Sequence, residues 1–408
     1  MSLYQSPKIV TDGLAFYYDM NNRPKSFIGP PRTNYIPNPY ASWNGSNFVL
    51  GYNYANLGAT YTYRTDVQNP INAPGVLEYY TGTTGYKYFS IDSTAVPTTG
   101  TYTFSYYARL TNSSANNVNN SQLWRANGSD RSVSGDWNPT YTSTWRRYTT
   151  SGPIEAGTIL QYFPIHSGSI TGGYTIQFCG FQLEFDSYAT PFVDGTRSNT
   201  QSILDLTTNN TITASSLTYA SDGTFSFDRA ASNSIVTNLP ITATRALSNF
   251  TYEVILNVTG LPPASNNGVV LGATYYAGAA IYWRTSGSNF NIRGFIRGAD
   301  AYRTTAEYTL SLNTVYHVAM TNNYSAGTLN LYVNGILFSS VATATQEYNP
   351  SLTPGLNIGI NLPQVDGGGA ETYSYFTGKV HLAKVYYQAL TAAQVQQNFN
   401  ALRGRYGI

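Results

Sequence analysis

The stretch TLNLYVNGILFSSV, residues 328–341, contains the clearest structural signal in this sequence. Asn334-Gly335 separates the apolar segments LNLYV and ILFSS. This dipeptide favours a two-residue type I′ turn, because both central residues of that turn need a positive φ. The stretch therefore predicts an antiparallel β-hairpin.

Similar short apolar segments lie on both sides of the hairpin. From about residue 202 onward they include TFSFDR, NFTYEVILNVTG, AAIYWRT, NFNIRGFIRG and FTGKVHLAKVYYQ. A separate series between residues 34 and 194 includes TYTFSYYARL, whose residues alternate with the period of two that a half-buried strand shows. Strands at this spacing are typical of sandwiches and jelly rolls, whereas the polar run TNSSANNVNNSQ at 111–122 predicts an exposed loop.

The composition supports an all-β protein. The chain has 37 Tyr and 36 Gly, and only 10% of its residues are charged, compared with about 25% in typical globular proteins. Aromatic and β-branched residues suit a pleated, half-buried surface. Only LTAAQVQQNFNALRGR near the C-terminus predicts a helix, with Thr391 as its N-cap and apolar residues at Leu390, Val395, Phe399 and Leu402.

Length and charge restrict the class further. A chain of 408 residues exceeds the roughly 250 residues at which single cores stop growing, so we expect two domains. The net charge of +2 without a basic run argues against nucleic-acid binding. No segment predicts a signal peptide or membrane insertion, and the single cysteine, Cys179, is expected in a core. These features predict a soluble protein made in a cytoplasm.

The C-terminal part resembles the laminin-G-like, concanavalin A-like lectin/glucanase superfamily, in particular its phage and bacterial branch. The resemblance is carried by FTYEVILNV, TVYHVAMTNNYSAGTLNLYVNGILF, LNIGI and FTGKVHLAKVYYQALTAAQVQQNFNALRGRYGI. The N-terminal IVTDGLAFYYD resembles the first strand of the same family, although it lies far from the rest. We therefore expect residues 1–33 and 196–408 to form one lectin-like sandwich, and the first strand to pair near the other end of the chain.

Residues 34–195 are then an inserted domain, because insertions are tolerated at exposed loops whose ends lie close together. They resemble the carbohydrate-binding-module-like jelly rolls of tailed-phage structural proteins. The residues that carry this resemblance are NYIPNPYASWN, TYTFSYYARL, STWRRYTTSGPI and TIQFCGFQLEFDSYATPFVDGTRS. The predicted fold is all-β: two β-sandwiches (jelly rolls), one inserted in the other, with a short C-terminal helix.

Catalytic signatures are weak in this sequence. Glu184 and Asp186 would share a strand face, but they lie at the exit of the inserted module and are better explained as structural or rim charges. His166, His317 and His381 lack zinc-ligand spacing. We therefore expect no enzyme activity. The resembled families often hold calcium, and a structural calcium ion could take oxygen ligands from Asp12, Asp19, Asp194, Asp205, Asp222 or Asp366.

Aromatic residues are the candidates for ligand contact, since sugar rings stack on Trp and Tyr. The candidates are Trp43, Tyr52, Tyr54 and Trp137 in the inserted domain, and Trp283 on a concave face of the other sandwich. For any single aromatic residue, a place in a core or interface is the more frequent outcome.

The sequence-based hypothesis is a non-enzymatic virion structural protein, a fibre, tail or capsid-decorating subunit, that binds host surface glycan or neighbouring virion proteins. The low charge and near absence of cysteine suit an assembly subunit that folds in a reducing host cytoplasm. A homo-oligomer is expected, with a trimer suggested by analogy to fibres. The alternatives are a purely architectural decoration subunit and a polysaccharide-active enzyme or accessory module.

Overall fold

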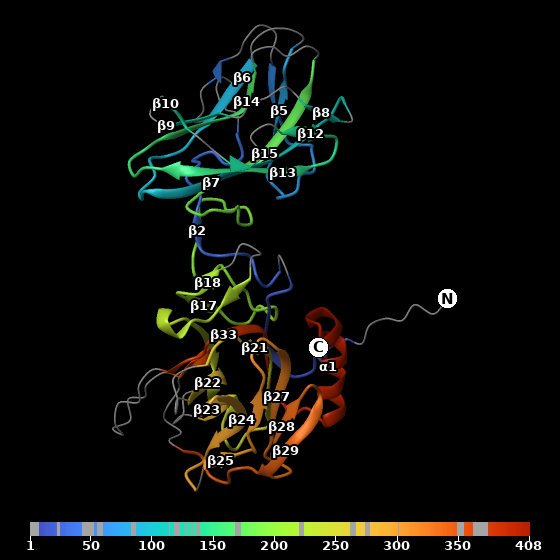
Figure 1. Cartoon of the computed structure of the whole chain (residues 1–408). Helices are drawn as coiled ribbons and strands as arrows, with labels where there is room; N and C mark the ends of the chain where they lie inside the picture. Colours follow the sequence, from blue (N-terminus) through green and yellow to red (C-terminus); the bar gives the residue numbers. More distant parts are fainter. Residues whose placement is uncertain are drawn as a thin grey trace. The chain divides into compact units, whose positions relative to one another are not determined.

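The computed structural model describes residues 8–408 apart from 23–24, 43–52, 55–59, 83–86, 114, 118–122, 127–128, 132–133, 136–138, 168–172, 220–223, 262–266, 274–277, 301, 349–354 and 362–373. The chain forms two compact units (Figure 1). The host unit comprises Met1–Pro30 and Asn199–Ile408, and the inserted unit comprises Pro31–Ser198. Antiparallel sheets make up most of both units, so the predicted all-β fold is confirmed.

The host unit is a sandwich of two main sheets. The first has six strands in the order β1-β33-β21-β27-β28-β29: β1 (Leu14–Asp19), β33 (Gly378–Tyr386), β21 (Phe250–Val258), β27 (Val315–Asn323), β28 (Thr328–Val333) and β29 (Ile336–Ala342). The second has the order β17-β20-β30-β22-β23-β24-β25: β17 (Ile212–Ser215), β20 (Ser234–Pro240), β30 (Gly355–Ile358), β22 (Asn267–Gly272), β23 (Ala279–Ser286), β24 (Asn289–Arg297) and β25 (Tyr302–Thr304), with β26 (Tyr308–Leu310) also pairing with β24.

Short elements complete the host unit. They are β18 (Thr218–Tyr219) with β19 (Phe225–Ser226), β31 (Ile360–Asn361) with β32 (Ser374–Tyr375), and the 3-10 helices η1 (Arg229–Ala231) and η2 (Ile241–Thr244).

The first strand of the chain belongs to the host unit. β1 pairs antiparallel with β33, with Phe16 opposite Val385 and Asp19 opposite Leu382. The expectation that the opening strand pairs near the far end of the chain is confirmed.

The hairpin predicted from residues 328–341 is also confirmed. β28 and β29 are antiparallel and Val333 lies opposite Ile336. Asn334 has a φ of 49° and Gly335 a φ of 78°, as a type I′ turn requires. β29 is the last strand on this side of its sheet, beyond β28 in Figure 1.

The predicted C-terminal helix is α1 (Ala392–Tyr406). The Thr391 side chain accepts a hydrogen bond from the Gln394 backbone N–H, and the Gln394 side chain in turn accepts one from the Thr391 backbone. This capping box satisfies N–H groups that the helix itself cannot pair. At the other end, Gly407 has a φ of 69°, the left-handed conformation that glycine adopts without strain. The buried face of α1 includes Val395 and Leu402 as expected, and also the polar Asn398.

Asn398 belongs to a buried polar network that joins α1 to the six-stranded sheet. Its Nδ2 donates to Glu253 Oε2 at 2.7 Å, and Lys384 Nζ lies 2.7 Å from the other oxygen, Glu253 Oε1. His317 Nε2 lies 2.9 Å from the same Oε1. The backbone N–H of Val10 donates to Asn398 Oδ1 at 2.7 Å. The network therefore joins the start of the described chain and its last helix to the same sheet.

The end of α1 is held by a second buried carboxylate. Asp19, at the end of β1, has no exposed surface. Tyr17 OH donates to Asp19 Oδ2 at 2.8 Å, Arg405 Nη2 lies 2.5 Å from the same oxygen, and Tyr406 OH donates to Asp19 Oδ1 at 2.5 Å. A buried charge needs such partners, because an unpaired one would be costly.

The inserted unit has two main sheets of its own. One follows the order β11-β13-β7-β15-β5-β4: β11 (Ser134–Gly135), β13 (Arg146–Ile154), β7 (Gly100–Leu110), β15 (Thr175–Glu184), β5 (Val76–Tyr80) and β4 (Thr60–Arg64). The other follows β10-β9-β14-β6-β3: β10 (Ser129–Arg131), β9 (Leu123–Ala126), β14 (Leu160–Ser167), β6 (Lys87–Asp92) and β3 (Asn53–Tyr54). Two small sheets pair β12 (Thr140–Thr142) with β8 (Ala115–Asn117), and β16 (Thr196–Arg197) with β2 (Arg32–Thr33).

One local prediction is corrected in the inserted unit. Residues 111–122 were expected to be an exposed loop without strands, yet Ala115–Asn117 pair with Thr140–Thr142. Main-chain pairing does not require apolar side chains, so a polar segment can add a strand wherever a partner edge is open.

The core of the inserted unit is aromatic. Tyr102, Phe104 and Tyr106 point inward from alternate positions of β7, and the rings of Phe104 and Tyr162 stack with centroids 3.7 Å apart. Cys179 is buried as expected, and burial raises the pKa of its thiol to about 12. In the described part of the chain, no helix is long and apolar enough to span a membrane.

Candidate functional site

The outer face of the eight-stranded host sheet carries a group of charged and aromatic side chains that point away from the core. On β23, Ile281 and Trp283 point into the core, so the alternate residues Tyr282 and Arg284 point outward. The register places Tyr282 opposite Arg293 on β24 and Arg297 opposite Tyr302 on β25. We call this surface the arginine face; its members are Asn267, Tyr282, Arg284, Arg293, Arg297, Tyr302 and Glu307.

A small apolar cluster forms the floor of the arginine face. Val269, Ala280, Tyr282 and Phe295 pack together on this side of the sheet, separate from the main core. The rings of Tyr282 and Phe295 have centroids 5.5 Å apart. Tyr282 OH donates a hydrogen bond of 2.6 Å to Asn267 Oδ1. The floor is therefore rigid, and it fixes the side chains that stand on it.

Two of the arginines share one carboxylate oxygen. Arg284 Nη1 lies 3.5 Å and Arg293 Nη1 lies 3.3 Å from Glu307 Oε1. Neither makes the two parallel short bonds of a bidentate arginine–carboxylate pair. The Arg284 side chain is 52% exposed, and Nε of Arg293 is buried without a hydrogen-bond partner among the described residues. Both guanidinium groups thus keep donor capacity for another acceptor.

Arg297 is held by aromatic rings. Its Cζ lies 3.7 Å from the ring centroid of Tyr302 and 4.1 Å from that of Tyr348. These are cation–π distances, which favour a fixed guanidinium orientation. Tyr302 is 46% exposed, so part of its side chain remains accessible to a ligand.

Asn357 adds a polar group to the same side of the sheet. It lies opposite Gly272 on β22 and Val236 on β20. Its side chain is 1% exposed, yet neither Oδ1 nor Nδ2 has a hydrogen-bond partner among the described residues. An unsatisfied buried amide costs about 1–3 kcal/mol, and at 1% exposure this side chain is not open to a ligand at the surface.

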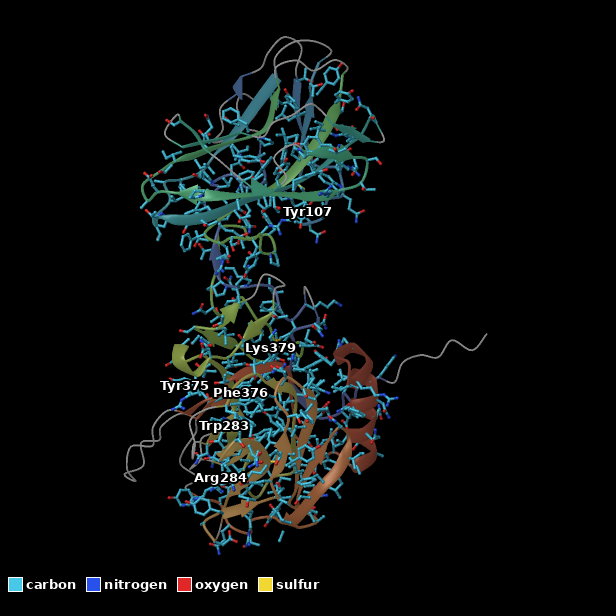
Figure 2. The ribbon with its side chains drawn as sticks, in the orientation of Figure 1. Tyr107, Trp283, Arg284, Tyr375, Phe376 and Lys379 are labelled. Carbon is cyan, nitrogen blue, oxygen red and sulfur yellow. The ribbon has the colours of Figure 1, made fainter. Side chains whose placement is uncertain are left out.

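Of the five aromatic residues predicted from the sequence, the structure describes the side chain of Trp283 alone. Trp43, Tyr52 and Trp137 lie outside the described residues. Tyr54 is in β3, which pairs with β6, and only its backbone is described. Trp283 is fully buried, with its ring stacked on Phe290 at 5.5 Å between centroids. This burial assigns Trp283 to the core, whereas the next residue, Arg284, points outward; Figure 2 labels both side chains.

Sequence reasoning missed the arginines. The signal was present in NFNIRGFIR, where Arg293 and Arg297 alternate with core residues. The sequence does not reveal which strands lie beside NFNIRGFIR. The position of Arg293 next to Arg284 and Glu307 could therefore not be derived from it.

The two acids considered for catalysis have structural partners. Glu184 is buried; its Oε1 accepts from the Thr190 backbone N–H at 2.7 Å, and its Oε2 accepts from Thr190 Oγ1 at 2.6 Å. Burial raises the pKa of Glu184, although the bonds from Thr190 counteract part of this. Asp186 forms an ion pair with Arg32. The structural interpretation explains both positions.

The described residues contain no group of three or more His, Cys, Asp or Glu side chains that could hold a metal ion. Asp205 accepts from the Tyr17 backbone N–H and from Thr207 and Asn210, and Asp194 accepts from Tyr40. Asp222 and Asp366 lie outside the described residues. For His166 only the backbone is described, in β14; His317 is in the buried network, and burial lowers the pKa of His381 to about 4.

One family model matches a part of the host unit. Residues 230–396 match the family model described as the Concanavalin A-like lectin/glucanases superfamily, so the host unit contains a lectin-like domain of this type. No curated protein matches the chain.

Among solved structures, the binding domain of botulinum neurotoxin serotype D is 14% identical, with a TM-score of 0.36 and coverage of 50% of each chain. The heptameric SAP-like pentraxin of Limulus polyphemus is 17% identical, with a TM-score of 0.30 and coverage of 46% of this chain and 80% of that one. Domain 4 of the arabinanase AbnA from Geobacillus stearothermophilus, solved with arabinotriose, is 16% identical, with a TM-score of 0.34 and coverage of 49% and 92%. The chain spans about half the length of the first of these structures.

Proposed function

We propose that this protein is a non-enzymatic lectin whose host unit binds a glycan on the arginine face. The observation that carries the proposal is the pair of arginines, Arg284 and Arg293, that share a single oxygen of Glu307. Guanidinium groups with spare donors, next to a partly exposed tyrosine, suit a ligand that offers oxygen acceptors and C–H faces. The match of residues 230–396 to a lectin superfamily is consistent with a sugar as that ligand.

The charge of the face favours an acidic glycan. Arg284, Arg293 and Arg297 carry three positive charges, and Glu307 is the single acid among the described residues of the face. A carboxylate or sulfate group on a sugar could form bidentate bonds to one guanidinium. Because these charges are near the surface, screening by salt should weaken such binding.

The test is a glycan array on the full chain, followed by titration calorimetry with the glycans that bind. Replacing Arg293 by Ala should reduce affinity about 10- to 100-fold, since hydrogen bonds to charged groups contribute about 1.5–3 kcal/mol. The matched control is Arg303→Ala, because Arg303 lies on the opposite side of the sheet, where it pairs with Asp300 at 2.9 Å. Equal affinity in both variants, or no glycan bound by the unmodified chain, would rule out the proposal.

The absence of catalysis is part of this proposal. It is supported by the structural partners of Glu184 and Asp186, which leave no free pair of acids at that position. Incubation with the bound polysaccharide should release no reducing ends. Release that disappears in Glu184→Gln would show that the protein is an enzyme.

A finer proposal concerns the setting: a fibre, tail or decoration subunit of a virion, made in a host cytoplasm, that contacts host glycan or neighbouring virion proteins. It is supported by the low charged fraction and single cysteine of the sequence and by the resemblance of both units to virion modules. Gold-labelled antibody against this chain should decorate intact particles. Particles that carry the chain while an array gives no glycan signal would instead favour a purely architectural role.

A further inference from the structure

The two edge strands of the six-stranded host sheet, β1 and β29, differ in whether another segment of the chain covers their free main-chain groups. At one edge, β1 is covered by residues 205–210. The Tyr17 backbone N–H donates to Asp205 Oδ1 at 2.9 Å, the Leu206 backbone N–H donates to Tyr17 O at 2.7 Å, and Asn210 Nδ2 donates to Ala15 O at 2.9 Å. These bonds satisfy the main-chain groups of β1 that face away from β33.

The opposite edge, β29, has no such cover. Among the described residues, no hydrogen bond reaches a backbone group of Ile336–Ala342 from outside β28; only the Ser339 side chain is engaged, by the Ala306 backbone N–H at 3.0 Å. Three consecutive apolar side chains on this strand are exposed: Ile336 by 69%, Leu337 by 49% and Phe338 by 43%. Phe338 contacts Tyr308 edge-on, so part of this surface is already ordered.

Sheet proteins usually protect an open edge with charge, proline, a bulge or a covering segment. Here residues 308–346 contain no Asp, Glu, Lys or Arg, and β29 contains no proline. Leu331 and Tyr332 on β28 pair with Ser339 and Leu337, which leaves Phe338 as the extra residue of a β-bulge. This bulge is the one protective feature of the strand. An apolar, uncharged and uncovered strand is what strand addition by a partner requires.

We propose that β29 is a homotypic interface, where a second copy of this chain adds its own β29 antiparallel and extends the six-stranded sheet. Two features favour a second copy over another protein. The segment carries no charge, so pairing with itself brings no like charges together. Pairing about a two-fold axis at Ser339 also places Ile336 opposite Ala342, Leu337 opposite Val341 and Phe338 opposite Ser340, so none of the three large exposed side chains faces another of the three.

The first test measures the mass of the full chain by light scattering after size exclusion, at tens of micromolar. The unmodified chain should elute with twice the monomer mass. Leu337→Lys should elute as a monomer, because a lysine at the edge is a common natural block to strand addition. The matched control, Leu261→Lys, alters a residue of similar exposure, 40%, outside β29 and should remain a dimer. A single cooperative thermal unfolding transition of Leu337→Lys checks that the variant is folded.

The second test identifies the contact. Opposite residues of an antiparallel pair have Cα atoms about 4.5–5.5 Å apart, which a disulfide can bridge. Ser339→Cys should therefore form a covalent dimer under mild oxidation, whereas Ser286→Cys, at an exposed residue of β23, should not. A monomeric unmodified chain, a dimer that persists in Leu337→Lys, or a dimer that Ser339→Cys fails to link would each overturn the proposal.

Discussion

Replacing Glu253 by Gln tests the buried network beneath α1 most directly. In the native chain, Glu253 Oε1 lies 2.7 Å from Lys384 Nζ and 2.9 Å from His317 Nε2, and all three side chains have no exposed surface. Gln keeps the shape but removes the charge. Lys384 then has no carboxylate within ion-pair distance, and the ammonium must either stay charged in the interior or lose its proton.

The expected loss is about 3–5 kcal/mol, the range for breaking a buried ion pair by removing one partner. The pKa of Glu253 is shifted in the direction that this loss implies. Burial alone would raise this pKa, but the charge of Lys384 and the hydrogen bond from His317 more than offset burial and hold the pKa at about 2, against an ordinary value of 4.5. The lowered pKa of Glu253 means that its charged form stabilises the folded state at neutral pH, whereas burial lowers the pKa of Lys384 and opposes part of this gain.

The assay is native-state hydrogen exchange on the full chain, followed at the amides of β21 and β33, because this readout reports on the host unit alone. The double variant Glu253→Gln with Lys384→Met is the control, since it removes both charges and should recover most of the loss. A single variant that loses less than about 1 kcal/mol, or a double variant no more stable than the single one, would refute this account of the network.

Two further predictions follow from the same unit. The pKa of His381 is lowered from 6.5 to about 4, chiefly by burial and also by Lys379, so the neutral ring is favoured in the folded state. The contribution of this histidine to the free energy of unfolding should therefore be complete above pH 6.5 and fall between pH 6.5 and 4. His381→Asn should abolish this loss, which thermal melts across the same pH range would measure. Gly359 has a φ of 76°, and a Cβ there would lie 2.4 Å from the ring of Phe227. Gly359→Ala should therefore lower the free energy of unfolding of the host unit by about 2 kcal/mol or more, measured by urea titration. The control is Gly404→Ala in α1, where a Cβ meets no atom within 4 Å, and it should be neutral or slightly stabilising.

The elements that could be predicted from the sequence are those with strong local signals. Asn334-Gly335 specifies its own turn, and Thr391 with Gln394 specifies the start of α1, because both signals depend on neighbouring residues only. The pairing of β1 with β33 was accessible through the resemblance, since no local signal joins residues so far apart. Strand Ala115–Asn117 was missed because its polar residues carry no burial pattern.

The candidate site was harder to predict because it depends on which strands are neighbours. The sequence drew attention to Trp283 as a large aromatic residue, but on a strand the inward and outward positions alternate, and a shift of one residue exchanges core for surface. Here Trp283 is inward and Arg284 outward. The face emerges only when β23, β24 and β25 are aligned, which brings Arg284, Arg293 and Arg297 together.

The pairing of β1 with β33 also has a consequence for biosynthesis. Leu14–Asp19 leave the ribosome well before their partner strand Gly378–Tyr386, which lies about 360 residues later in the sequence. At about 5–20 residues per second, the opening strand waits tens of seconds for its partner, while Pro31–Ser198 are complete long before. We expect the inserted unit to fold on the nascent chain and the host unit to close only after Gly378–Tyr386 have emerged, so that protease resistance of arrested chains should appear first for the inserted unit.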